Sequence, residues 1–390
     1  MIINRNLSES LLEMSKKYPV VSLTGPRQSG KTTLLKHIFP EKEYVSLEDP
    51  DIRLFAQKDP KGFLSNYEKG AILDEIQRVP ELFSYIQTIV DKQNVMGMFI
   101  LSGSQNFLLS EYITQTLAGR IAVLKLLPLS YNELKNHQVV SSSIEEYLFK
   151  GAYPAIYDRE INPIQFYSNY LQTYVERDVR QLKNISDLSL FVKFLKLCAG
   201  RIGQLLNMSS LANDCGISVN TVKSWISILE ASYILFLQHP YHKNFNKRLV
   251  KMPKLYFYDT GLASSILGIE NTKQLSSHYL IGGLFENYII SELIKNRFNK
   301  GLNSNTYFWR DSKGHEVDCV LEYGDKIIPI EIKSGKTISL EYFKNLKYWK
   351  NISSCSSDNA MVIYGGNKTL NTKEGTLLSW NQLNEFINNL

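Results

Sequence analysis

The sequence predicts a multidomain α/β protein, and three observations lead to that prediction. The chain has 390 residues, which is more than a single hydrophobic core usually serves. Its first third alternates short β-branched runs with amphipathic stretches, the order expected of a parallel sheet with crossover helices. Its middle is rich in helical patterns, and its last third returns to closely spaced strand patterns. We therefore expect a parallel-sheet core first, a helical middle, and a second α/β domain last.

The composition excludes several classes of protein. With 44% hydrophobic and 21% charged residues, the chain is ordinary for a globular protein and is not expected to be disordered. No run of 18 apolar residues occurs, and the first residues lack the apolar core of a secretory signal. The four cysteines are far apart, without a Cys-x-x-Cys pair, which argues against a zinc knuckle or a disulfide framework. We expect a soluble, cytoplasmic protein with no membrane partner.

A glycine-rich loop follows the first strand pattern, at residues 20–24. It reads Gly-x-x-x-x-Gly-Lys-Thr and leads into a helical stretch, which is the context that a phosphate-binding loop needs. Backbone N–H groups and the helix N-terminus bind the anion. Lys31 is predicted to neutralise charge on the β- and γ-phosphates, and Thr32 to place its hydroxyl on Mg²⁺. The predicted ATP-binding residues are Gly25, Pro26, Arg27, Gln28, Ser29, Gly30, Lys31, Thr32 and Thr33.

An acidic pair ends a second buried run, at residues 70–73. Asp74 is predicted to hold Mg²⁺, directly or through water, and Glu75 to orient or activate the attacking water. An apolar run that ends in Asp-Glu is common by itself, so this interpretation depends on the phosphate-binding loop upstream. Together the two motifs predict ATP hydrolysis, with Lys31 and Glu75 as catalytic residues.

Polar residues near two further strand patterns are weaker candidates. Ser104 or Gln105 follows the apolar run 98–103 and is predicted either to contact the γ-phosphate or the water, or to form a plain polar loop. Arg120 is the third candidate catalytic residue, an arginine finger that reaches a γ-phosphate in its own or a neighbouring subunit. The alternative for Arg120 is a solvated charge at a helix end. An arginine finger that reaches a neighbouring subunit requires a homo-oligomer, and the sequence does not determine whether one forms.

The middle of the chain carries a helix-turn-helix pattern at residues 209–230. Gly216 suits a left-handed C-cap, Ser218 suits the N-cap of the next helix, and that helix has apolar residues at positions i, i+4 and i+7. Two later strand patterns, at residues 233–237 and 254–258, would complete a winged helix.

The formal net charge of +6 coincides with the surplus of one segment. Residues 186–255 contain nine Lys or Arg against three Asp or Glu, and the remainder holds 35 of each sign. This surplus predicts DNA as a partner, through phosphate contacts. The alternative is a module for protein contacts or a domain spacer. The second helix of the pattern carries Lys223 as its one cation, and a single cation is weak support for the recognition of base edges. The remaining candidate phosphate contacts are Lys243, Lys247, Arg248, Lys251 and Lys254.

A Glu-x-Lys pattern lies in the strand run 326–334. Side chains alternate along a strand, so Glu331 and Lys333 are expected on one face while the intervening isoleucines face the core. Asp318, from the adjacent strand, is expected to converge on them, and Glu286 on the preceding helix adds a third carboxylate. Carboxylates that hold a second Mg²⁺ or Mn²⁺, with a lysine that positions water, are the parts of a metal-dependent phosphodiesterase.

The motifs resemble those of AAA-type ATPases of bacteria and archaea that carry a C-terminal PD-(D/E)XK, or restriction-endonuclease-like, domain. The matching stretches are Leu-Thr-Gly-Pro-Arg-Gln-Ser-Gly-Lys-Thr-Thr, Leu-Glu-Asp-Pro, Ile-Leu-Asp-Glu-Ile-Gln, Leu-Ser-Gly-Ser, Leu-Ala-Gly-Arg and the landmark Glu176-Arg177-Asp178. The resemblance runs over nearly the whole chain and implies ATP use, with Asp318, Glu331 and Lys333 at the core positions of the nuclease-like domain. The expected domains are an AAA-type P-loop ATPase at 1–135, a helical lid or connector at 136–185, a winged helix at 186–262 and a nuclease-like domain at 263–390.

Three functions fit these patterns. The leading one is a Mg²⁺-dependent ATPase that couples nucleotide state to a DNA-binding winged helix and a nuclease-like domain. The second is a non-catalytic DNA-binding regulator with ATP as a switch, and the third is an ATP-gated, structure-specific nuclease. A retained nuclease fold can also serve for binding alone. A small-molecule phosphotransferase is a weaker fourth, because the Asp74-Glu75 pair favours water as the acceptor.

Overall fold

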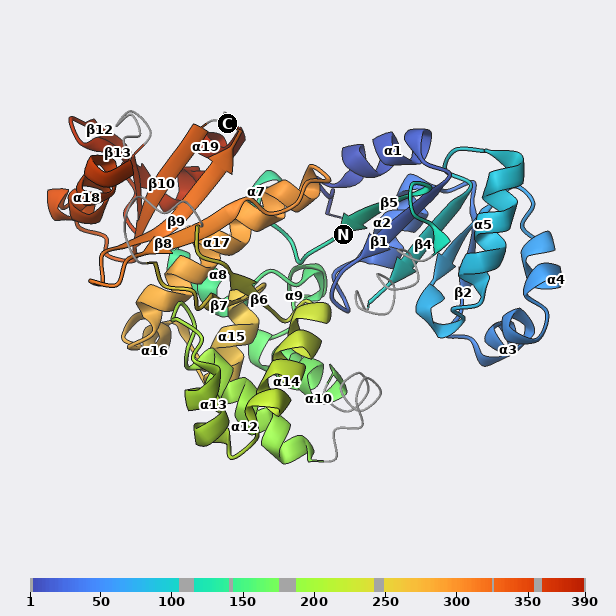
Figure 1. Cartoon of the computed structure of the whole chain (residues 1–390), viewed down its shortest axis with the longest axis horizontal. Helices are drawn as coiled ribbons and strands as arrows, with labels where there is room; N and C mark the ends of the chain where they lie inside the picture. Colours follow the sequence, from blue (N-terminus) through green and yellow to red (C-terminus); the bar gives the residue numbers. More distant parts are fainter. Residues whose placement is uncertain are drawn as a thin grey trace. The chain divides into compact units, whose positions relative to one another are not determined.

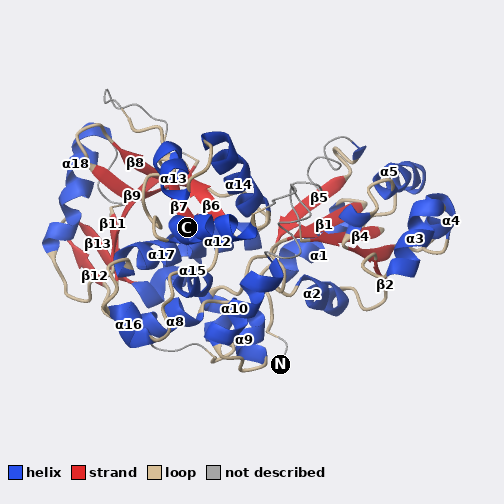
Figure 2. Ribbon diagram, turned by 90° about the horizontal axis from the view of Figure 1, so that it is seen from below, coloured by secondary structure: helices blue, strands red, loops and turns tan. Residues whose placement is uncertain are grey.

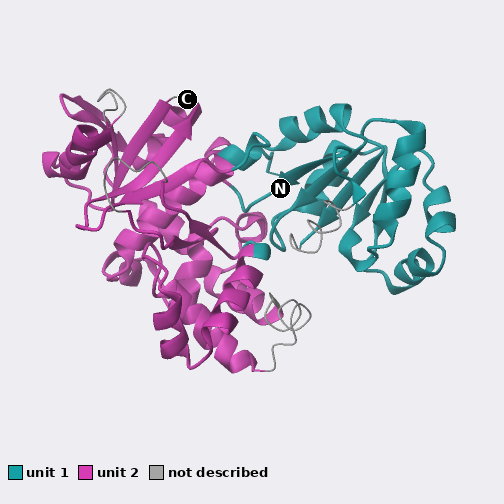
Figure 3. Cartoon of the chain, in the orientation of Figure 1, with its two compact units in different colours: residues 1–129, 231–233, 297–303 teal, residues 130–230, 234–296, 304–390 magenta. Residues whose placement is uncertain are grey.

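The computed structural model describes residues 3–104, 116–139, 143–174, 187–241, 249–324, 326–353 and 360–388. Several predicted positions lie outside these residues: Gln105, Glu176, Arg177, Asp178, Lys243, Lys247 and Arg248. The chain divides into two compact units (Figure 3). The first comprises residues 1–129, 231–233 and 297–303, and the second comprises residues 130–230, 234–296 and 304–390.

The first unit is built on a five-stranded sheet in the order β2-β3-β4-β1-β5 (Figure 1). Every neighbouring pair is parallel. The central strands are short, mostly apolar and buried on both faces, as parallel strands covered by helices are. This confirms the predicted parallel-sheet core. The strand bounds are β1 Val20–Thr24, β2 Glu43–Ser46, β3 Ala71–Asp74, β4 Phe99–Gly103 and β5 Ile121–Lys125.

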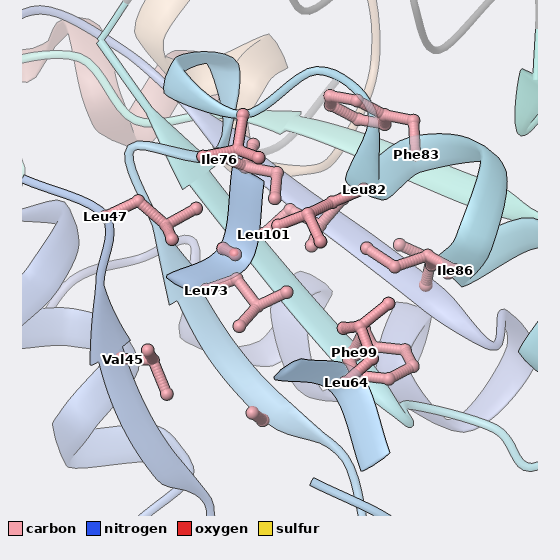
Figure 4. Packing of buried hydrophobic residues seen from close by; sticks show 14 of the residues in the cluster. Val45, Leu47, Leu64, Leu73, Ile76, Leu82, Phe83, Ile86, Phe99 and Leu101 are labelled. Atoms are coloured by element: carbon pink, nitrogen blue, oxygen red, sulfur yellow. The ribbon is translucent and has the colours of Figure 1, made fainter. Parts of the chain in front are cut away.

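Helices cover both faces of this sheet. Leucines of α1 (Ser8–Lys17) and α2 (Lys31–Ile38) pack on one face. The apolar faces of α3 (Pro50–Lys58), α4 (Pro60–Ser65) and α5 (Leu82–Gln93) pack on the other. Figure 4 shows this second layer, in which side chains of the helices meet those of β2, β3 and β4. The two apolar layers hold the carboxyl ends of the strands in register at one edge of the sheet.

The second unit begins with helices. Three of them, α8, α10 and α12, pack on α15, and Figure 2 shows this group as blue ribbons. Among the described helices, none is both long and apolar enough to cross a membrane. The helix bounds are α7 Tyr131–Asn136, α8 Ile144–Lys150, α9 Pro154–Asp158, α10 Pro163–Tyr174, α12 Leu188–Ala199, α13 Met208–Cys215, α14 Val219–Ala231, α15 Thr260–Ile266, α16 Thr272–Ser276, α17 Ile281–Asn299, α18 Lys344–Ser353 and α19 Leu383–Asn388.

The helix pair α13–α14 has the local signals that the sequence predicts. Gly216 ends α13 in the left-handed conformation, and its N–H donates to Ala212 O at 2.9 Å. Ser218 Oγ accepts from the N–H of Thr221 at 3.0 Å, which caps the start of α14. Two antiparallel strands follow, β6 (Leu235–Gln238) and β7 (Lys254–Phe257). The helices and strands of the predicted pattern are thus present in the predicted order.

A mixed six-stranded sheet completes the second unit, in the order β12-β13-β11-β10-β9-β8. Strand β11 is parallel to β10 and β13, whereas β10–β9, β9–β8 and β13–β12 are antiparallel. Helix α18 packs on β9 and β10, and its Asn345 contacts Glu331, which is 3% exposed. The isoleucines on either side of Glu331, Ile330 and Ile332, are buried as predicted. The bounds are β8 Thr306–Arg310, β9 Glu316–Tyr323, β10 Lys326–Lys333, β11 Met361–Tyr364, β12 Leu370–Thr372 and β13 Gly375–Ser379.

Candidate functional site

The glycine-rich loop joins the carboxyl end of β1 to the N-terminus of α2. Its first glycine, Gly25, has a φ of +153°, and a Cβ there would lie 2.1 Å from Leu126 O. Its last glycine, Gly30, is the N-cap of α2 with a φ of +92°. An L-residue at either position would be strained. The N-terminus of α2 receives no hydrogen bond from a side-chain cap, so the first turn of the helix offers its N–H groups to an anion.

Lys31 folds back over the loop. Its ammonium group donates to Gly25 O at 2.9 Å and to Pro26 O at 2.8 Å, and its side chain is buried. These carbonyl contacts keep the positive charge against the backbone of the loop. A phosphate group seated on the loop would offer Lys31 a charged acceptor, and hydrogen bonds to charged groups are stronger than those to neutral carbonyls.

Asp74 collects hydrogen bonds at the end of β3. Its Oδ2 accepts from the Thr32 hydroxyl at 3.0 Å and from the Tyr44 hydroxyl at 2.6 Å. Its Oδ1 accepts from the Ser102 hydroxyl and from the N–H of Glu75 at 3.2 Å. Burial and the Asp74 charge raise the pKa of Tyr44 above its ordinary value, so Tyr44 stays a donor. The structure therefore brings the predicted Mg²⁺ ligands, Thr32 and Asp74, into direct contact.

Glu75 is held next to this pair in an unusual conformation. Its φ of +55° is rare for a residue other than glycine, and such strain concentrates at functional sites. Its Oε2 accepts from the Gln77 side chain and from Ser104 Oγ at 3.3 Å. Ser104, predicted to contact the phosphate or the water, thus contacts the carboxylate that is predicted to activate the water.

Two contributors to this site were missed at the level of sequence. Arg5, near the start of the chain, donates to Ser29 O at 2.7 Å and to Leu127 O at 2.6 Å, and so ties the phosphate loop to the segment that follows β5. Tyr44 reaches Asp74 from β2. A lone arginine or tyrosine has no motif of its own, so no signal in a single sequence would have found either residue.

Arg120 lies at the amino-terminal ends of the strands, whereas the phosphate loop lies at their carboxyl ends. It precedes β5, and its carbonyl accepts from Val20 N at the start of β1. Gly25 follows Val20 by five positions along β1 and its end, which is roughly 16 Å of strand. Arg120 forms an ion pair with Asp91 instead. This placement does not support an arginine finger that acts on ATP bound to the same subunit. An arginine finger that acts on ATP in a neighbouring subunit stays a prediction.

The C-terminal candidates converge on one place in the second unit. Lys333 Nζ lies 2.6 Å from Glu331 Oε1 and 3.6 Å from Asp318 Oδ2. Asp318 Oδ2 also accepts from Ile332 N at 2.8 Å, and Asn345 of α18 donates to Glu331 Oε1 at 3.3 Å. The second oxygen of Glu331, Oε2, is buried and has no hydrogen-bond partner among the described residues. Burial and the Asp318 charge raise the pKa of Glu331 to about 8.

Glu286 pairs with a lysine that also approaches Asp318. Lys254 Nζ lies 2.9 Å from Glu286 Oε1, and the Tyr256 hydroxyl donates to the same oxygen at 2.6 Å. Burial raises the pKa of Glu286 to about 7, although the Lys254 charge acts in the opposite direction. Within the described part of the chain, no group of three or more His, Cys, Asp or Glu side chains is arranged to hold a metal ion. Glu286 therefore contacts Lys254 in the structure, and its role as a third metal ligand stays a prediction.

The structure contradicts the prediction that Lys254 contacts DNA phosphates. The residue is 2% exposed, and its ammonium group pairs with acidic residues of the second unit. Of the other candidate phosphate contacts, Lys223 and Lys251 are exposed.

Comparison with known protein families divides the chain into three matched segments. Residues 17–135 match the family model of the AAA domain. Residues 141–273 and 281–383 match two models that are each described as a domain of unknown function, DUF8612 and DUF4143. The nuclease-like identity of the last segment is thus not shown by its family model.

The relatives extend over most of the chain. An uncharacterized protein of Mycobacterium tuberculosis is 28% identical over 345 residues, which are 87% of this chain and 76% of that protein. An uncharacterized protein of Methanocaldococcus jannaschii is 24% identical over 351 residues, 82% of this chain and 75% of that protein.

Solved structures overlap less closely. The Walker-type ATPase of Pyrococcus abyssi superimposes with a TM-score of 0.47 at 14% identity, over 68% of this chain and 96% of that chain. The AMPPCP-bound DnaA of Aquifex aeolicus gives a TM-score of 0.31 at 14% identity, over 57% of this chain and 85% of that chain. The loop motif, the parallel sheet and the family model together assign residues 17–135 to an AAA-type P-loop domain, followed by helical and mixed-sheet regions.

Proposed function

We propose that the chain is a Mg²⁺-dependent ATPase of the AAA type. The observation that carries the proposal is the contact of Thr32 with Asp74, with the strained Glu75 beside them, at the carboxyl edge of the sheet. Ligands of open α/β sheets bind at this edge. The AAA domain match and the uncapped N-terminus of α2 support a nucleotide there.

The loop backbone and four side chains each have one task in the proposed mechanism. The loop N–H groups bind the phosphates, and Lys31 turns from the carbonyls of Gly25 and Pro26 to the phosphate charge. Thr32 and Asp74 would hold Mg²⁺, which supplies charge stabilisation to the transferred phosphoryl group. Glu75 leaves Gln77 and Ser104 to orient the attacking water and take its proton.

Phosphate release from ATP by the purified chain, with and without Mg²⁺, tests this proposal. The Glu75→Gln variant should bind ATP like the wild type but turn it over roughly 100-fold or more slowly, because it cannot accept a proton. Exposed Glu81 provides the matched control, and Glu81→Gln should hydrolyse ATP normally. Normal turnover by Glu75→Gln would remove the proposed role in water activation.

We further propose that nucleotide state is coupled to DNA through the α13–α14 pair. The charge surplus of residues 186–255 supports an anionic partner. Exposed Lys223 on α14 and exposed Lys251 before β7 are the described positions that suit phosphate contacts. A DNA-binding regulator that uses ATP as a switch would bind DNA through the same residues. Very low ATP turnover would distinguish it from a protein that hydrolyses ATP continuously.

A second candidate function is metal-dependent phosphodiester cleavage at Asp318, Glu331 and Lys333. The buried, unpartnered Oε2 of Glu331 favours it, because a divalent cation would supply the missing partner. Asp318 and Glu331 would hold the ion, and Lys333 would position the water and offset phosphate charge. This site is the one that an ATP-gated nuclease would use.

Cleavage of linear, branched and single-stranded DNA, with Mg²⁺ or Mn²⁺, tests the second function. Cleavage should disappear in Asp318→Asn and Glu331→Gln but persist in Glu341→Gln, which changes an exposed glutamate of the same region. ATP hydrolysis and DNA binding without cleavage would leave the C-terminal domain a binding module.

A further inference from the structure

Three carboxylates of the second unit share one lysine. Lys254 Nζ lies 2.9 Å from Glu286 Oε1 and 3.9 Å from Asp318 Oδ1, and it also pairs with Glu316. Glu286 belongs to α17, whereas Glu316 and Asp318 belong to β9. We call these three residues and Lys254 the Lys254 cluster. The lysine comes from β7, which precedes the other two elements in the chain.

The local sequence places these groups on facing surfaces. Lys254 and Tyr256 are two apart on β7, so their side chains lie on one face, and both contact Glu286. Glu316 and Asp318 are likewise two apart on β9. The ring of Phe308 lies under the ammonium group, with its centroid 5.6 Å from Nζ. The cluster therefore follows from the alternation of side chains along β7 and β9 and from the position of Glu286 on α17.

Charge explains why these groups need one another. Lys254 is 2% exposed, and burying an ammonium group in such a place is strongly unfavourable unless the group is well paired. Three partly buried carboxylates would in turn repel each other without a cation between them. Arg310 pairs with Glu316 at 2.8 Å and Lys333 approaches Asp318 at 3.6 Å, but among the described residues Lys254 is the cation that reaches all three carboxylates. A pocket of carboxylate oxygens is otherwise the environment that hard divalent cations occupy in proteins.

We propose that the Lys254 ammonium takes the place of a metal ion among Glu286, Glu316 and Asp318. Glu286 is then an ion-pair partner and not a metal ligand. A divalent cation at the C-terminal site is held by Asp318 and Glu331, on the side of Lys333, and is not joined by a second ion on the side of Lys254. This last statement rests on the proposed phosphodiesterase site, whereas the assignment of Lys254 does not.

Counting bound Mn²⁺ tests the proposal directly. Titration of the nucleotide-free chain, followed by the electron paramagnetic resonance signal of free Mn²⁺, gives the number of ions per chain. We expect Lys254→Met to bind one Mn²⁺ more than the wild type, because the three carboxylates lose their cation. Lys254→Arg keeps the charge and should bind the same number as the wild type. An equal count in Lys254→Met and the wild type would overturn the proposal.

Thermal unfolding provides the second readout. Without metal, Lys254→Met should unfold at a lower temperature than the wild type, and Mn²⁺ should restore more of that loss than it adds to the wild type. If Lys254→Met folds only when Mn²⁺ is present, the proposal is supported. If Mn²⁺ neither restores its stability nor recovers its folding, the proposal fails.

Glu331→Gln separates this inference from the proposed phosphodiesterase. If the wild type binds an ion that Glu331→Gln loses, the phosphodiesterase site is supported. If neither binds an ion there while Lys254→Met gains one, the phosphodiesterase proposal fails and the assignment of Lys254 stands.

Discussion

The hydroxyl of Thr32 donates a hydrogen bond to Asp74 Oδ2 at 3.0 Å, across 42 residues of sequence. The bond joins the first turn of α2 to the end of β3. It therefore sets the distance between the two proposed Mg²⁺ ligands in the folded chain itself. The Tyr44 and Ser102 hydroxyls hold the same carboxylate from β2 and β4, so its position is determined by three neighbouring elements.

Replacing the Thr32 hydroxyl should weaken the Mg²⁺-dependent step. Thr32→Val keeps the shape of the side chain but removes the oxygen. A lost hydrogen bond to a charged group costs about 1.5–3 kcal/mol, or roughly ten- to hundredfold in rate or affinity. We expect turnover at saturating ATP to fall by that factor and to recover in part at higher Mg²⁺. Tyr44→Phe is the matched control, since it removes another donor to Asp74 but no Mg²⁺ ligand, and turnover dependent on Tyr44 as strongly as on Thr32 would contradict the assignment.

Arg5 should matter for the loop although it lies outside the motif. Arg5→Leu removes the donor to Ser29 O and Leu127 O, and leaves two backbone carbonyls without that partner. Unsatisfied buried groups cost about 1–3 kcal/mol each. We expect a lower melting temperature and weaker ATP binding by isothermal titration. Lys58→Ala, an exposed change on α3, should alter neither. Unchanged ATP affinity in Arg5→Leu would show that the loop keeps its conformation without the clamp.

Arg120 gives a prediction that depends on assembly. Because Arg120 lies at the edge of the sheet opposite the phosphate loop, Arg120→Ala should leave ATP affinity within about twofold of the wild type, which is under 0.5 kcal/mol. If neighbouring subunits complete the site, turnover per chain rises with protein concentration in the wild type and not in the variant. Asp91→Ala, which removes the Arg120 partner, should keep that concentration dependence. A loss of ATP affinity in Arg120→Ala would contradict the placement.

DNA binding should depend on exposed cations and not on Lys254. Lys223→Ala and Lys251→Ala together should weaken binding to duplex DNA. The plot of log affinity against log salt concentration should also become less steep, by the amount expected for the loss of up to about two phosphate contacts. Lys42→Ala, in the first unit, is the control for a general loss of charge. If fluorescence anisotropy shows the same affinity and salt slope in the double variant, the helix pair serves protein contacts or spaces the domains.

The parts of this protein that could be predicted from sequence are those with local signals. The loop from Gly25 to Thr32 has four fixed positions between a strand and a helix, and Gly216 and Ser218 carry their cap chemistry with them. The contacts of Arg5 and the direction of Lys254 depend on elements far along the chain, so no local pattern indicates them. The Glu-x-Lys alternation predicted that Glu331 and Lys333 share a face, but it could not indicate that α18 packs on this strand and contacts Glu331, because a covering helix leaves no pattern in the strand that it covers.

Glu331 predicts a pH dependence of stability in the absence of metal. Its pKa rises from 4.5 to about 8 in the folded chain, through burial and the Asp318 charge. A raised pKa means that the folded state holds the proton more tightly than the unfolded state. The resulting stabilisation is present below pH 4.5 and is lost as the pH rises through about 8.

Glu331→Gln removes this dependence, because glutamine stays neutral at every pH. We expect the melting temperature of the variant, relative to the wild type, to be at least about 2 °C higher at pH 9 than at pH 5, which corresponds to roughly 0.5–1 kcal/mol in a domain of this size. Both measurements are made with a chelator present, because a bound divalent cation would stabilise the charged carboxylate and reverse the effect. Glu341→Gln, at an exposed position, should show the same difference from the wild type at both pH values. A Glu331→Gln difference that does not grow with pH would mean that Lys333 keeps Glu331 ionised in the folded chain.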